Sequence, residues 1–112
     1  MKLNYSGTQG KGAWKKSGAT LPKFDWKKMC EATGKNYVWV HFEASNIFRG
    51  FIADLQQTLL NEWLAQNGIT AAETFNYESI DKIYDPHESM TLMVSLKPDG
   101  NTDKSVMASI AC

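Results

Sequence analysis

The chain has 112 residues, 43% of them apolar, and no net formal charge, which predicts a single domain with a hydrophobic core. No apolar run approaches the ~20 residues that span a bilayer, and the N-terminus lacks the apolar segment of a signal sequence. The charge is uneven, because residues 1–35 carry eight lysines against two acids. These lysines lack the sequence context of a nucleic-acid-binding protein. We therefore expect a cytoplasmic protein that binds neither membranes nor nucleic acid.

Residues 1–24 are predicted to form an irregular basic leader, and residues 25–112 an α/β body. Glycines and Pro22 interrupt the leader. Asp25 is a suitable N-cap for a short helix that ends near Gly34. Three apolar residues should anchor the leader to the body: Tyr5, Trp14 and Leu21.

The first half of the body is predicted to be a β-α-β unit. Residues 36–42 are almost all apolar, which is typical of a strand covered on both faces. An amphipathic helix should run from about residue 46 to residue 66, with Gly68 ending it. Residues 69–75 should form a second strand, parallel to the first.

The second half is predicted to contain a short helix and a hairpin. Residues 79–84 should form one or two helical turns, ended by Pro86. Residues 90–96 and 104–110 flank a turn rich in Pro, Asp, Gly and Asn, which favours an antiparallel hairpin.

The junction between the first strand and the long helix is the most informative stretch. An apolar run ends at Phe42, a short polar elbow follows, and the helix begins. Nucleotide-binding strand–turn–helix units have this layout, and their glycines let the backbone approach a pyrophosphate at the helix start. Here Glu43 and Ser45 occupy the two places where such an approach is needed.

Residues 37–112 resemble the N-terminal part of the mannitol dehydrogenase / fructuronate (mannonate) oxidoreductase family. The matching positions are Ala44 and residues 39–42, 46–53, 72–75, 80–85, 91–94 and 99–100. The resemblance implies a Rossmann-like β-α-β unit with a C-terminal antiparallel hairpin completing a mixed sheet. It also implies an ancestral NAD or NADP site, of which the following residues would be the remnant: Ala44, Ser45, Asn46, Ile47, Arg49 and Asn76.

The departures from the family pattern fall beside this expected site. Glu43, Ser45 and Trp63 stand where the family has glycines, and Asn76 stands where it has an acid. A carboxylate at position 43 repels phosphate, while Arg49 could neutralise a phosphate or pair with Glu43. Family members are several times longer and carry their catalytic lysine in a second domain. We therefore expect a truncated, non-catalytic scaffold or binding module of engineered origin, with no bound cofactor and weak or absent dinucleotide affinity.

Other functions stay open at this point. Ser45 is a favoured N-cap residue, but it could also be a nucleophile at a helix start, with His87 as base and Glu43 or Glu88 as the orienting acid. That arrangement would make the chain a redesigned serine hydrolase. A residual NAD-binding oxidoreductase domain is a further alternative.

No metal site is expected, because the histidines and acids that could hold zinc lack ligand spacing; His41 should be a structural residue. Trp63 is either core filling or an exposed anchor, and self-association through Trp63 and surface bared by truncation is expected. Cys30 and Cys112 are expected to be free thiols. At the elbow we expect negative φ at positions 43 and 45, with the Glu43 side chain leaning toward Arg49 or solvent.

Overall fold

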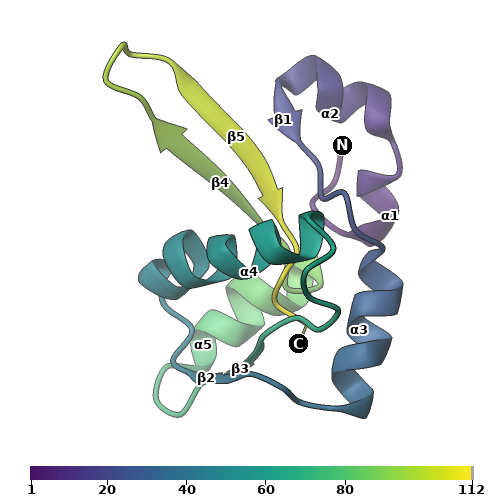
Figure 1. Cartoon of the computed structure of the whole chain (residues 1–112). Helices are drawn as coiled ribbons and strands as arrows, with labels where there is room; N and C mark the ends of the chain where they lie inside the picture. Colours follow the sequence, from purple (N-terminus) through teal and green to yellow (C-terminus); the bar gives the residue numbers. More distant parts are fainter. Residues whose placement is uncertain (112) are drawn as a thin grey trace.

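The computed structural model describes residues 1–111 and shows that the N-terminal segment is ordered (Figure 1). It contains helices α1 (Tyr5–Thr8) and α2 (Lys11–Ser17) and the short strand β1 (Ala19–Thr20), which pairs in parallel with β5 (Thr102–Met107) near the C-terminal end of the described chain. The prediction of an irregular leader was therefore wrong. The helices form because Asn4 caps α1 and Gly18, at φ +79°, closes α2 in a left-handed conformation that suits glycine.

The predicted anchors of this segment are confirmed. Trp14 is buried, and its indole N–H donates to the Gly7 carbonyl at 3.0 Å. Tyr5 and Leu21 pack against the same apolar cluster. Helix α3 (Trp26–Lys35) follows with Asp25 as its N-cap, also as predicted, since the Asp25 carboxylate accepts from the Lys28 N–H.

The predicted β-α-β unit is present, with shorter elements. Strand β2 (Val40–Phe42) leads into a helix that is π-helical over η1 (Phe48–Ile52) and α-helical over α4 (Ala53–Asn61). Strand β3 (Thr70–Ala72) returns parallel to β2, with Val40 opposite Thr70.

Two of the expectations for this unit were wrong. The first strand is not covered on both faces: His41 stacks on Phe48, whereas Val40 and Phe42, which point to the other face, are exposed. The helix ends at Asn61 rather than near residue 66. It ends early because Trp63 takes a left-handed conformation, in which the N–H groups of Trp63 and Leu64 return to the carbonyls of Leu60 and Leu59.

The helical segment after β3 is longer than the predicted residues 79–84. It comprises α5 (Tyr77–Ser79), the π-helical η2 (Ile80–Tyr84) and the 3-10 helix η3 (Asp85–His87). Pro86 does not end the helical segment, because it lies in the first turn of η3. A backbone N–H in the first turn has no intrahelical acceptor, so its absence in proline costs no hydrogen bond. Glu88, in a left-handed conformation, ends it instead.

The predicted antiparallel hairpin is confirmed as β4 (Thr91–Leu96) and β5 (Thr102–Met107), and it projects from the body (Figure 1). The order β1-β5-β4 forms one sheet and β2-β3 another. A parallel bridge between Ile69 and Ile110 links them, with the Ile69 N–H donating to Ser109 and the Ala111 N–H donating to Ile69. The result is a Rossmann-like α/β fold with parallel and antiparallel strands.

Two apolar clusters hold the fold together. One joins the N-terminal segment to α3 and the base of the hairpin, around Trp14, Met29 and Leu60. The other lies under the β-α-β unit, around Phe48 and Ile110.

Cys30 Sγ lies 3.8 Å from the Ala111 carbonyl oxygen, while the expectation for Cys112 lies outside the described residues. None of the helices described in residues 1–111 has the length and hydrophobicity of a transmembrane segment.

Candidate nucleotide-binding elbow

The elbow after β2 keeps a backbone shape that favours glycine. Its first residue, Glu43, donates its N–H to the Ala72 carbonyl at 2.8 Å and has φ +100°. The prediction of a negative φ at this position was wrong: the turn from β2 into the helix, with the Glu43 N–H still bonded to β3, takes a left-handed conformation despite its cost to a side chain. Ser45 is not among the residues of positive φ, as predicted.

Two carboxylates accept hydrogen bonds from the backbone N–H groups of the elbow. The Ala44 N–H donates to Glu73 at 3.2 Å, and the Ser45 N–H donates to Glu43 at 2.6 Å. In an intact dinucleotide site, backbone N–H groups at a helix start would face the phosphates. In this chain the carboxylates of Glu73 and Glu43 accept from these two N–H groups instead.

Both carboxylates are held in their charged form. Hydrogen bonds from the Ser45 hydroxyl and then from the Ser45 N–H lower the pKa of Glu43. For Glu73, the N–H groups of Phe75 and Asn76 are the main causes of a lowered pKa, and the Ala44 N–H adds to them. Glu73 thus ties the end of β3 to the elbow.

Ser45 directly precedes the helix, but within residues 1–111 no helix N–H donates to its hydroxyl, so the expected side-chain cap is not formed. Its carbonyl accepts from the Arg49 N–H at 3.1 Å, and the helix starts at the next residue, Asn46. Its backbone N–H donates to the Glu43 carboxylate at 2.6 Å. The Glu43 side chain therefore folds back over its own turn and stays exposed to solvent.

The Arg49 side chain forms hydrogen bonds with groups next to the elbow. Its guanidinium donates to the Ala44 carbonyl at 2.7 Å, to the Tyr84 hydroxyl at 3.4 Å and to the Asn46 side chain. The buried Tyr84 hydroxyl donates to the same Ala44 carbonyl at 2.8 Å, and burial raises the pKa of Tyr84. Within residues 1–111, no ion pair joins Arg49 to Glu43.

The remaining residues of the predicted remnant are at the surface. Ile47 is exposed, and Asn76 uses its backbone N–H to bind Glu73. His41 stacks on Phe48 with ring centres 4.3 Å apart, as expected of a structural residue. Among the described residues, no cluster of three or more His, Cys, Asp or Glu side chains is placed to hold a metal ion.

The structure does not assemble the Ser45–His87–acid arrangement. His87 Nδ1 lies 3.0 Å from the Leu3 carbonyl oxygen, and the Glu88 carboxylate accepts from the Tyr5 N–H at 2.6 Å. These two residues fasten the N-terminal segment to the body. In the part of the chain that the structure describes, no hydrogen bond joins Ser45 to His87.

Glu73 is the site residue that sequence reasoning missed. It directly follows β3, and the carboxyl ends of neighbouring parallel strands open onto the same crevice. An acid at that position was therefore a usable signal that the end of the second strand would reach the elbow.

Two known proteins are similar to the chain, one in sequence and one in fold. No model of a protein family matches the chain. The chain is 41% identical over 110 residues to a D-mannonate oxidoreductase of Thermotoga maritima. The match covers 98% of this chain and 20% of that protein. Its fold is similar to a D-sorbitol dehydrogenase crystallised in substrate-free form, with a TM-score of 0.68 and 19% identity over 84% of this chain and 19% of the other. The chain spans about a fifth of the length of both.

Proposed function

Because the chain belongs to the mannitol dehydrogenase / fructuronate (mannonate) oxidoreductase family as a short segment, we propose that it is a non-catalytic module with a closed dinucleotide site. In this proposal, Glu43 and Glu73 hold the elbow in a phosphate-bound shape without phosphate. The affinity for NAD and NADP is then weak or absent, and no hydride transfer takes place on this segment alone.

The occupied N–H groups of Ala44 and Ser45 carry the proposal. A dinucleotide would have to displace two charged hydrogen-bond acceptors before its phosphates could bind, and each remaining carboxylate would repel it. The left-handed Glu43 supports the same view, since it preserves the loop shape while its side chain fills the space over it.

Isothermal titration with NAD and with NADP tests the proposal. We expect no measurable binding, or binding only at millimolar concentration, to the unmodified chain. Glu43→Gly frees the Ser45 N–H and removes a negative charge, so it should raise affinity roughly tenfold or more. Glu73→Gln should act in the same direction, and the double variant should bind most tightly.

Glu31→Gln is the matched control, because it removes the same charge from the exposed surface of α3 and should leave binding unchanged. Circular dichroism confirms that each variant is folded. Micromolar binding by the unmodified chain would show that the site is open. Folded Glu43→Gly and Glu73→Gln variants without any gain would show that the carboxylates are not what closes it.

A further inference from the structure

One peptide group connects the inner and outer sides of the elbow. No cis peptide bond occurs among residues 1–111, so the Ala44 carbonyl and the Ser45 N–H, which share this group, point in opposite directions. The Ser45 N–H donates at 2.6 Å to Glu43 on the solvent-exposed side. The Ala44 carbonyl therefore points into the molecule.

Two side chains donate to this carbonyl from inside. The Arg49 guanidinium lies 2.7 Å and the Tyr84 hydroxyl 2.8 Å from the Ala44 oxygen. A carbonyl oxygen has two lone pairs, so these donors use its full accepting capacity. The Ala44 N–H donates at 3.2 Å to Glu73, so both backbone polar groups of residue 44 are held by side chains.

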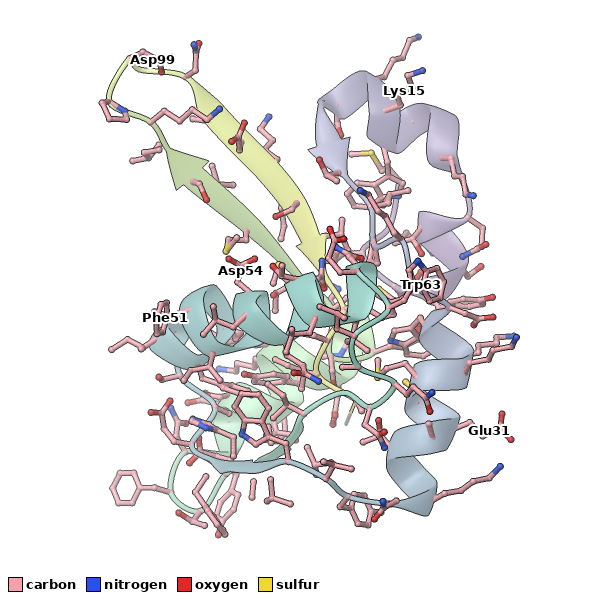
Figure 2. The ribbon with its side chains drawn as sticks, viewed as in Figure 1. Lys15, Glu31, Phe51, Asp54, Trp63 and Asp99 are labelled. Atoms are coloured by element: carbon pink, nitrogen blue, oxygen red, sulfur yellow. The ribbon has the colours of Figure 1, made fainter. Side chains whose placement is uncertain are left out.

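The Arg49 side chain faces the body of the protein. Figure 2 shows Phe51 at the outer end of the helix, pointing away from the body, and residues two positions apart lie on nearly opposite sides of a helix. The guanidinium also reaches the Tyr84 hydroxyl at 3.4 Å, and its carbon lies 5.6 Å from the centre of the Tyr84 ring. The charge of Arg49 is thus held against Tyr84.

The Tyr84 ring is held in place by packing. Tyr84 is the last residue of η2, is 3% exposed, and lies in the apolar cluster that contains Ala44 and Phe48. Burial raises the pKa of Tyr84, so the hydroxyl keeps its proton and remains a donor in neutral solution. A fixed ring gives the hydroxyl a fixed direction toward the Ala44 carbonyl.

We propose that Tyr84 and Arg49 are positioning residues of the elbow, which aim the Ser45 N–H at an anion by holding the Ala44 carbonyl. Without the Tyr84 hydroxyl, one donor remains and the planar peptide group can rotate. The anion is Glu43 in this chain. That a dinucleotide phosphate takes its place when Glu43 is removed rests on the function proposed above. Arg49 then acts through the backbone and not by neutralising a phosphate.

Tyr84→Phe tests the proposal, because it removes the hydroxyl, keeps the ring and changes no charge. Hydrogen bonds from the side chain and backbone of Ser45 lower the pKa of Glu43. In Tyr84→Phe, the pKa of Glu43 measured by NMR titration should rise toward its ordinary value. The Ser45 amide proton shift should follow the Glu43 titration in the unmodified chain and follow it more weakly in the variant. His41 and Glu73, whose charges also act on Glu43, stay in place.

Tyr37→Phe is the matched control, because it removes a hydroxyl from an exposed tyrosine before β2 and should change neither measurement. Arg49→Met removes the other donor and should also weaken the Ser45 amide response. Circular dichroism confirms that each variant is folded. Unchanged Glu43 and Ser45 titrations in folded Tyr84→Phe, or an equal change in Tyr37→Phe, would overturn the proposal.

Isothermal titration with NAD separates this inference from the proposed function. In the Glu43→Gly background, adding Tyr84→Phe should lower NAD affinity roughly threefold to tenfold, while adding Tyr37→Phe should not. If Glu43→Gly binds no NAD, the proposed closure by Glu43 fails, and the Glu43 and Ser45 titrations alone decide the role of Tyr84. If Glu43→Gly binds NAD equally well with and without Tyr84→Phe, the positioning role is wrong and the closure stands.

Discussion

At the scale of single residues, two positions keep a glycine-like backbone with large side chains. Glu43 has φ +100° and Trp63 has φ +61°. Both positions have a backbone conformation that favours glycine. A side chain at a left-handed position costs roughly 1 kcal/mol relative to glycine.

Trp63 offers the cleaner measurement of this cost. It is 73% exposed and sits at the left-handed position of a Schellman motif, where glycine is the favoured residue. Trp63→Gly should therefore be more stable than Trp63→Ala by about 1 kcal/mol, since both variants lose the ring and only glycine relieves the backbone. Urea denaturation of the two variants gives the difference.

The same pair of substitutions at Leu59, inside the helix, is the control. There the free energy of unfolding should be about 1 kcal/mol higher for Leu59→Ala than for Leu59→Gly, because glycine is a poor helix former. If Trp63→Ala proved as stable as Trp63→Gly, the left-handed conformation at this position would carry no strain.

At the scale of elements, one polar side chain joins the long helix to the hairpin. Gln57 is buried in α4, its amide N–H donates to the Val106 carbonyl at 2.7 Å, and its amide oxygen accepts from the Ala108 N–H at 2.6 Å. Val106 is the last residue but one of β5, and Ala108 directly follows the strand. Gln57 completes the backbone hydrogen bonding that the end of the strand leaves open.

Gln57→Met keeps the length of the side chain and removes both hydrogen bonds. Two buried backbone groups would then lack partners, so the free energy of unfolding should fall by about 2–4 kcal/mol. Chemical denaturation measures the loss. Thr58→Ala, at the next and exposed position of the same helix, should change stability by less than about 1 kcal/mol. An equal loss in both variants would mean that helix propensity, and not the Gln57 bridge, sets the effect.

At the scale of the whole molecule, the N-terminal segment is part of the fold. Its β1 strand adds a third strand to the hairpin sheet, and Trp14 packs in the apolar cluster shared with α3. His87 and Glu88 form hydrogen bonds with the backbone of residues 3 and 5. Its basic charge therefore lies on a packed structure and not on a loose extension.

Trp14→Ala tests how far this segment stabilises the molecule. Loss of a tryptophan that is 4% exposed should reduce the free energy of unfolding by about 3–5 kcal/mol. Thermal or urea denaturation, with Trp63→Ala as the exposed-tryptophan control, measures it. A Trp14→Ala variant as stable as the control would show that the segment can detach without cost to the body.

The local pattern of the sequence was enough to predict the main elements. Apolar periodicity predicted the strand–helix–strand unit, Asp25 predicted the start of α3, and the turn residues around Gly100 predicted the hairpin. Each of these features depends on residues near one another in the chain. For the same reason the elbow between β2 and the helix was identifiable from residues 39–53 alone.

The tertiary structure decided which groups meet across the chain. Glu73 reaches Ala44, Tyr84 reaches the same residue, and His87 and Glu88 hold the N-terminal segment instead of Ser45. The backbone at Glu43 follows the turn between β2 and the helix and not the preference of glutamate. Periodicity within a segment cannot report these contacts, because a hydrogen bond between distant residues depends on how the segments pack and on which backbone groups that packing leaves unpaired.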